Sequence, residues 1–218
     1  MVGKDVQIIE YSRPVDRANT VTHLIGAVLS VIGTVLLVKA SANTREALCG
    51  IIYGLTLVIV YTASTVYHGL PVGEKKRIAR LIDHSAVPLL IAGTATPCAM
   101  ISLYRVSPAH GITVFICGWA CALFGIFSKL FFFERLKTVT MTVYIVCGSL
   151  MLISAVPRLG ELDAGGFWWL VAGCAAYLIG ALLCGLGAKR EWLHAVFHVF
   201  VMLGSGLHFY AIYAFIIK

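Results

Sequence analysis

The sequence contains few charged side chains for its length. Only 12% of its 218 residues are Asp, Glu, Lys or Arg, whereas a water-soluble domain carries about 25%. Apolar residues make up 60% of the chain, and the mean hydropathy is +0.91. With so little charge the chain cannot cover a water-facing surface, which excludes a soluble globular domain, a disordered protein and a nucleic-acid-binding domain. We therefore interpret the net charge of +7 as the charge of membrane loops.

Two other patterns are missing. The strands of an outer-membrane barrel would alternate apolar and polar residues over about 10 positions. The apolar runs here are continuous instead, as from Leu48 to Tyr61, where Thr56 is the only Ser or Thr. The first 20 residues are rich in charge and contain no apolar stretch, so we expect no cleaved secretory signal. Low-complexity linkers are absent as well.

What the sequence does contain is seven apolar stretches. A helix needs roughly 20 mostly apolar residues to cross the hydrocarbon layer of a membrane. Stretches of about this length run over residues 22–38, 47–67, 81–103, 111–132, 138–156, 166–187 and 194–217. They predict an all-α membrane protein, a bundle of seven transmembrane helices. We expect a short N-terminal segment, residues 1–20, followed by a single seven-helix domain, residues 21–218.

The distribution of Lys and Arg predicts the orientation of the bundle. Eleven of these residues lie in the N-terminal segment or in connections on the same side of the predicted membrane, and five lie on the other side. Cytoplasmic loops carry the excess of Lys and Arg. We therefore expect the N-terminus in the cytoplasm and the C-terminus outside.

Ionisable residues inside membrane helices indicate function by default, because they are costly there. Under the predicted topology, five of them fall at the cytoplasmic ends of their helices: His23, His68, Asp83, His194 and His198. Ser64 lies one helical turn before His68. The topology was obtained from Lys and Arg alone, so the common level of these residues is an independent observation.

The spacing of the histidines fits a metal site. His194 and His198 are four residues apart, which places both imidazoles on one helix face. His68 could supply a third nitrogen, and catalytic zinc takes three protein ligands and keeps a fourth position for water. Asp83 would then hold that water or act as general base. Ser64 would hydrogen-bond to the water or to Asp83.

Each of these residues also has an ordinary structural interpretation. Asp83 could cap the third helix through the helix dipole, and His68 could be a solvated residue at a helix end. His23 and His84 fit an interface role better than a ligand role. His208 lies in the middle of the last stretch, and we expect it to hydrogen-bond to a neighbouring helix. Because the five ionisable residues at the cytoplasmic helix ends are predicted to lie at the same depth in the membrane, we favour the metal site over the separate structural interpretations.

Four segments of the chain resemble the progestin and adiponectin receptor family, and within it the bacterial hemolysin III branch. They are DRANTVTH (16–23), STVYH (64–68), LIDHSAVPLLIAGTATP (81–97) and HAVFHVFVMLGSGLHFYAIY (194–213). The resemblance covers about residues 12 to 215. It implies a seven-helix fold with a zinc ion near the cytoplasmic face. Carried over to this chain, the zinc ligands are His68, His194 and His198, while Asp83 and Ser64 surround the metal-bound water.

The resemblance also carries implications for location and activity. It implies a multi-pass protein of the bacterial plasma (inner) membrane, with a cytoplasmic N-terminus as in eukaryotic relatives. The wider superfamily includes alkaline ceramidases, which hydrolyse a lipid amide, and the bacterial branch is linked to haemolysis and to membrane-fluidity control. One departure is Asp16, where the family usually has Glu, so the negative charge is kept.

Three functions are compatible with these features. The first is a zinc-dependent hydrolase that acts on a lipid amide or ester. The second is a non-enzymatic membrane sensor or regulator in which zinc only staples helices together. The third is a cytolytic pore or transporter, for which Pro88 and Pro97 could break the third helix, but few polar groups lie at mid-membrane. A membrane lipid is the expected substrate or ligand, and nucleic acid is not expected as a partner.

Gly50 and Gly54 form a small-xxx-small pair in the second stretch. Such pairs allow close approach of two membrane helices. The contact could lie within the bundle, which we favour, or between chains, so the oligomeric state is not predicted.

Overall fold

The computed structural model describes residues 3, 5–156, 163–187 and 190–217, which form helices and contain no β-strand, so the predicted all-α class is confirmed. The long helices are α1 (Arg13–Ala40), α2 (Thr44–Gly69), α3 (Glu74–Pro97), α5 (Pro108–Phe132), α6 (Lys137–Ile153), α7 (Ala164–Gly187) and α8 (Trp192–Ala211). The short elements are the π-helices η1 (Cys98–Leu103) and η3 (Ile212–Ile216) and the single turn α4 (Tyr104–Val106).

Six helices among the described residues are long and apolar enough to cross a membrane. The span that begins with α3 continues through η1 and α4 to Val106, and the span that begins with α8 continues through η3 to Ile216. α6 is apolar but shorter, because its 17 residues rise only about 26 Å, less than the ~30 Å of a hydrocarbon core. It ends at Ile153, whereas the sequence predicted a span to residue 156. The chain is thus a multi-pass membrane protein, and the part that the structure describes contains six helices long enough to span the membrane and one shorter apolar helix.

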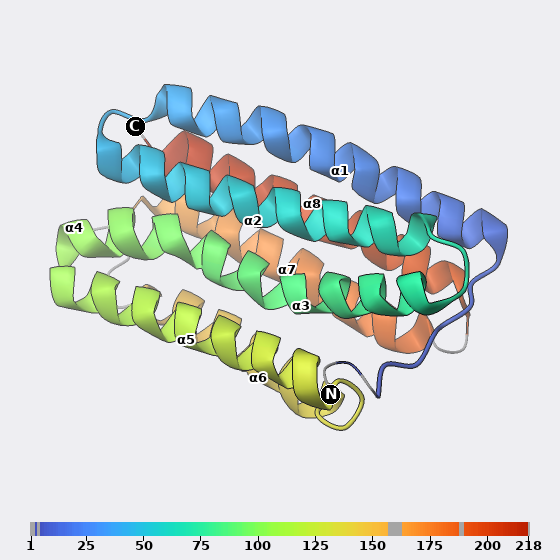
Figure 1. Ribbon diagram of the computed structural model, residues 1–218. Helices are drawn as coiled ribbons and strands as arrows, with labels where there is room; N and C mark the ends of the chain where they lie inside the picture. Colours follow the sequence, from blue (N-terminus) through green and yellow to red (C-terminus); the bar gives the residue numbers. More distant parts are fainter. Residues whose placement is uncertain (1–2, 4, 157–162, 188–189, 218) are drawn as a thin grey trace.

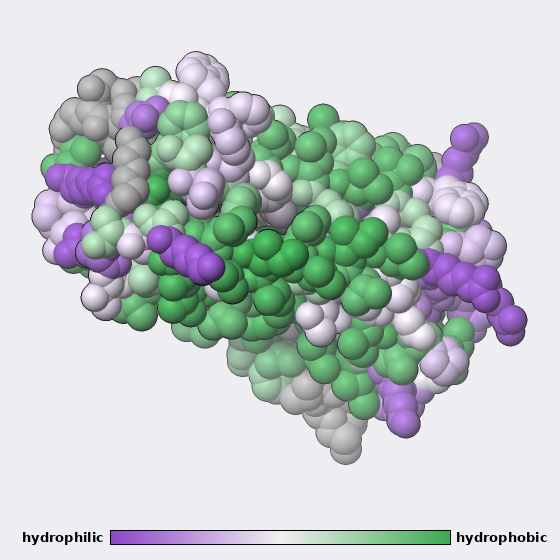
Figure 2. Space-filling model, turned by 90° about the horizontal axis from the view of Figure 1, so that it is seen from above, coloured by the Kyte–Doolittle hydropathy of each residue, from purple (hydrophilic) through white to green (hydrophobic). Residues whose placement is uncertain are grey.

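The outer surface of the bundle is apolar. Figure 2 shows a broad hydrophobic band, with hydrophilic residues gathered at the two ends of the molecule. On α1 the side chains of Leu24, Val28 and Leu29 are 51%, 55% and 55% exposed. Exposed apolar area of this extent is unfavourable in water and suits the hydrocarbon of a bilayer.

The long helices pack in chain order around a closed ring, in which α8 returns to contact α1 (Figure 1). Glycines bring α1 and α2 together. A Cβ on Gly54 would lie 2.0 Å from Oγ1 of Thr34, and one on Gly50 would lie 3.1 Å from Cβ of Leu37. The Gly50–Gly54 pair therefore forms a contact within the bundle, as we favoured from the sequence.

The two prolines of α3 do not split it. α3 continues through Pro88, and Pro97 is followed directly by η1 and then α4. A π-helical stretch preserves the course of a helix while it accommodates the backbone groups that a proline leaves unpaired. The expectation that these prolines break the helix, as in transporters, is wrong for the described structure.

One end of the bundle gathers the residues of interest. α1, α3 and α8 begin there and α2 ends there, and the N-terminal segment lies across it, while η3 ends at the opposite end (Figure 1). α1 begins at Arg13 with Pro14 in its first turn, a position that suits the fixed φ of proline. Since α1 starts earlier than the apolar run suggested, Asp16 and Asn19 lie on a helix that faces α2.

Candidate metal centre

Two helices bring three histidines together at this end. His194 and His198 lie one turn apart near the start of α8, and their Nε2 atoms are 3.2 Å apart. His68 lies next to the last residue of α2, and the ligand nitrogens of all three histidines lie within 4.8 Å of one another. His68 and His198 are buried, whereas His194 is partly exposed. The structure thus gathers the three ligands predicted from the sequence, and the alternative of a solvated His68 is wrong.

The spacing of one nitrogen pair suits two ligands of a single tetrahedral ion. Two nitrogens held at about 2.0–2.1 Å from zinc lie about 3.3 Å apart at the tetrahedral angle, close to the separation between His194 and His198. Nε2 of His68 is buried and has no hydrogen-bond partner among the described residues. Leaving a buried polar atom unpaired is costly. An ion bound by the three histidines would satisfy this atom.

Asp16 fixes the orientation of His68. An oxygen of its carboxylate lies 3.0 Å from Nδ1 of His68, and the amide nitrogen Nδ2 of Asn19 lies 3.2 Å from the same ring nitrogen. In the tautomer that donates Nδ1–H to the carboxylate, Nε2 carries the free lone pair that a metal requires. Carboxylates that hold ligating histidines in this way raise the basicity of the ring and fix its tautomer.

A buried lysine compensates the charge of Asp16. Nζ of Lys76 lies 2.7 Å from the second oxygen of this carboxylate and also donates to the carbonyl of Leu70 at 3.2 Å. The Lys76 side chain is only 1% exposed. A lysine is almost never buried without a partner, so the pair with Asp16 is what allows it to lie here. Lys76, Asp16 and His68 form one connected chain of polar contacts that leads to the candidate ligand set.

The sequence did not identify Asp16 or Lys76 as members of this site. Lys76 was counted as a loop cation, because the apolar stretch of the third helix begins only at residue 81, whereas α3 begins at Glu74. A usable signal was the four-residue spacing of Lys76 and Arg80. It places both on one face of α3, and both are buried.

Asp83 and Ser64 lie near each other. The Ser64 hydroxyl and the Arg80 guanidinium both interact with the Asp83 carboxylate and favour its charged form. Asp83 is not part of the group of close ligand atoms formed by the three histidines. It lies roughly two and a half turns inside α3. The alternative that Asp83 caps this helix is therefore wrong.

The N-terminal segment covers the histidines. The Tyr11 ring stacks on His194, with ring centres 4.9 Å apart and planes at 19°, and lies 5.6 Å from the ring of His68. Burial raises the pKa of the Tyr11 hydroxyl above its usual range. Further along the segment, Arg80 donates to the carbonyl of Gln7, and the backbone N–H of Glu134 donates to Asp5. These contacts fasten the segment across the end of the bundle.

A hydrogen bond to α8 holds the segment next to Tyr11. The backbone N–H of Ser12 donates to the carboxylate of Glu191 at 2.8 Å, one residue before α8 begins. This donation lowers the pKa of Glu191 below its ordinary value of 4.5. The segment is thereby tied to the helix that carries two of the three histidines.

His23 lies directly behind His198. The two rings are stacked with centres 3.8 Å apart, and the Tyr61 ring meets His23 edge-on at 5.0 Å. His23 is buried, and neither of its ring nitrogens has a hydrogen-bond partner among the described residues. It is therefore close to the centre without belonging to the group of three.

The other histidines lie outside the centre. Nε2 of His208 lies 3.0 Å from the carbonyl of Leu170 on α7, so its predicted hydrogen bond to a neighbouring helix is confirmed. His84 packs edge-on against Phe133. His110 lies in the first turn of α5, at the opposite end of the bundle.

The chain is similar to known proteins over a range that includes every residue of this centre. The model of a family described as Haemolysin-III related matches residues 11–209. The chain is 34% identical over 204 residues to the Hemolysin-3 homolog of Bacillus subtilis (strain 168), which covers 92% of this chain and 94% of that one. It is 33% identical over 203 residues to Hemolysin-3 of Bacillus cereus, with 92% and 91% covered.

A mammalian protein is more distantly similar. The chain is 26% identical over 209 residues to the Monocyte to macrophage differentiation factor of Homo sapiens, with 92% of this chain and 84% of that one covered. No solved structure matches the chain.

Proposed function

Because the chain belongs to the Haemolysin-III related family, we propose that it is a zinc-binding membrane protein that hydrolyses an amide or ester bond of a membrane lipid. The observation that carries the proposal is the close group of His68, His194 and His198, each of which offers a ligand nitrogen within 4.8 Å of the others. Nε2 of His68 is buried and has no hydrogen-bond partner among the described residues. In the tautomer that donates Nδ1–H to Asp16, this nitrogen is a free acceptor.

The proposed arrangement in the membrane has seven crossings, with α6 as the shortest. Two observations support it. The N-terminal segment and the end of η3 lie at opposite ends of the bundle (Figure 1). The excess of Lys and Arg lies at the end where α1 begins. The histidines then face the cytoplasm of a bacterial cell, at the surface of its plasma (inner) membrane.

Zinc suits the donor set. Three neutral imidazoles with a fourth position left open are the ligands of catalytic zinc, whereas structural zinc takes four protein ligands. Asp83 lies outside the close group, which supports an open fourth position. When bound, zinc supplies electrophilic activation of a carbonyl group and of water at neutral pH.

The carboxylate of Asp83 is the proposed general base. Hydrolysis adds water to the carbonyl carbon and breaks the C–N or C–O bond. Asp83 takes the proton from the attacking water and returns it to the leaving amine or alcohol. Ser64 and Arg80, which both interact with this carboxylate, would orient it. Tyr11 and the N-terminal segment cover the centre and exclude bulk water from one side.

Replacing Asp83 tests this assignment. Asp83→Asn keeps the size of the side chain but removes the base, so we expect fatty-acid release to fall by about 10²–10⁴-fold while zinc stays bound. The measurement is fatty-acid release from a panel of lipid amides and esters by the full chain in lipid vesicles, together with zinc content. Glu74→Gln is the matched control, since Glu74 lies exposed in the first turn of the same helix.

Two results would contradict the hydrolase assignment. Unchanged release by Asp83→Asn would exclude this residue as the base. An unmodified chain that holds zinc but releases fatty acid from no lipid would favour the alternative of a zinc-stapled sensor, in which the three histidines only join α2 to α8.

A further inference from the structure

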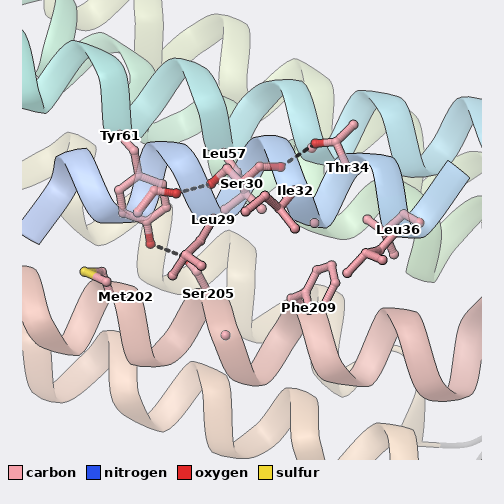
Figure 3. Close-up of a pocket in the computed structure, with 15 residues that line it drawn as sticks. Leu29, Ser30, Ile32, Thr34, Leu36, Leu57, Tyr61, Met202, Ser205 and Phe209 are labelled. Carbon is pink, nitrogen blue, oxygen red and sulfur yellow. Dashed lines mark hydrogen bonds between the residues drawn. The ribbon is translucent and has the colours of Figure 1, made fainter.

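An apolar groove lies between α1, α2 and α8 on the membrane-facing side of the bundle (Figure 3). Its volume is about 260 Å³. Along α1 its lining runs from Gly26 to Leu37, which corresponds to about 16 Å of helix. Phe209 reaches α1 at Gly33 and narrows the outer part. The groove is thus long and slender.

The walls of the groove offer no free polar group along α1. The Ser30 hydroxyl donates to the carbonyl of Gly26 at 2.7 Å, and the Thr34 hydroxyl donates to that of Ser30 at 2.6 Å (Figure 3). Leu29 and Ile32 complete this wall and are 55% and 51% exposed toward the membrane. A surface of this kind repels water and attracts hydrocarbon.

Polar side chains of α2, α7 and α8 meet at one end of the groove. Tyr61 donates to Oγ of Ser205 at 2.7 Å on its floor (Figure 3), and Tyr177 contacts the same hydroxyl. The Tyr61 ring also meets His23, which lies one turn before Gly26 and stacks on His198. The end of the groove near Gly26 therefore adjoins the candidate metal centre.

We propose that this groove binds one acyl chain of a membrane lipid, which enters from the bilayer between α1 and α8. The proposal rests on the proposed function in one respect: the lipid bound here is the one whose polar end reaches the histidines. His23 lies between Tyr61, which lines the groove, and His198. Its buried ring nitrogens, which have no hydrogen-bond partner among the described residues, would supply hydrogen-bonding groups for that polar end.

The dimensions and direction of the groove favour a lipid over other occupants. A helix of a second chain is about 10 Å wide and does not fit into 260 Å³. A lipid whose head group lies at the membrane face of the histidines has its tail directed toward the middle of the membrane. The groove runs in the same direction, from Gly26 toward Leu37.

Gly206 allows the groove to be filled without disturbing the packing. It lines the groove, and a Cβ built on it meets no atom within 4 Å. Gly206→Phe therefore places a ring in the open space. Gly185→Phe is the matched control, because Gly185 is equally open but lies on α7, away from the groove.

The experiment uses the full chain in phosphatidylcholine vesicles that contain a phosphatidylcholine with a photoreactive diazirine on one acyl chain. After irradiation, mass spectrometry locates the adducts. We expect them to concentrate on the groove faces of α1 and α8, and Gly206→Phe to lower their yield there about tenfold. Gly185→Phe should leave the yield unchanged.

The outcomes separate this proposal from the hydrolase assignment. The groove walls do not include His194 or His198, so adducts should persist in the double variant His194→Ala/His198→Ala. If adducts persist but no lipid is hydrolysed, the groove stands and the proposed function fails. Labelling spread evenly over all lipid-facing helices, labelling insensitive to Gly206→Phe, or crosslinks between chains at the groove would overturn the groove proposal.

Discussion

At the residue scale, the candidate metal centre depends on the buried ion pair of Asp16 and Lys76, which cannot be predicted from composition or hydropathy. Asp16 accepts from Lys76 with one oxygen and contacts His68 with the other. Asp16 contributes a short carboxylate. The same group neutralises a buried lysine and, when it accepts from Nδ1–H of His68, selects the tautomer of a candidate ligand.

The role of Asp16 leads to a prediction about metal affinity. Asp16→Asn removes the negative charge behind His68, and we expect zinc to bind about 10–100-fold more weakly. Asp16→Glu keeps the carboxylate and should retain most of the affinity. Competition with a zinc-binding dye measures the dissociation constant of the purified chain, and thermal unfolding of the zinc-free variants serves as the control for a general loss of structure. Equal affinity of Asp16→Asn and the unmodified chain would show that Asp16 has no orienting role.

At the element scale, the N-terminal segment is the part of the molecule that could not be predicted from periodicity. Its contacts join Tyr11 to His194 and Ser12 to Glu191, pairs that are far apart in the chain. Apolar patterns report which helix faces are buried, but they carry no information about where a polar segment lies. The segment was therefore expected only as a short leader to the bundle, whereas it covers the candidate centre.

Because of the hydrogen bond between Ser12 and Glu191, we expect the attachment of the N-terminal segment to α8 to depend on pH. The folded pKa of Glu191 lies below its ordinary value of 4.5, so the bond stabilises the closed segment fully above that value. The stabilisation is lost as the pH falls below 4.5 and through the folded pKa. Hydrogen exchange, expressed as the protection factor of the amide of Ser12, should show lower protection in this range.

The variant Glu191→Gln tests whether the titration of Glu191 causes this loss of protection. The glutamine oxygen still accepts from Ser12 but does not titrate, so protection should become independent of pH between about 3 and 6. If protection in this variant still falls with pH in the same way, another group controls the segment.

At the scale of the whole molecule, much of the arrangement was accessible from sequence. The apolar stretches predicted the all-α membrane fold, and Lys and Arg counts placed three distant histidines at one level, where the structure brings them together. The start of α3 was not accessible, because a helix continues beyond the membrane into polar residues such as Lys76. The short length of α6 was also missed, since hydropathy does not locate the turn that follows Ile153.

At the centre of the proposed function is one metal ion shared by α2 and α8. Its direct test is the metal content of the purified full chain, compared with His194→Ala/His198→Ala and with the control His110→Ala, whose histidine lies at the opposite end of the bundle. We expect about one zinc per chain for the unmodified protein and the control, and none for the double variant. A chain purified without zinc that fails to bind added zinc, or a double variant that retains zinc, would contradict the metal site.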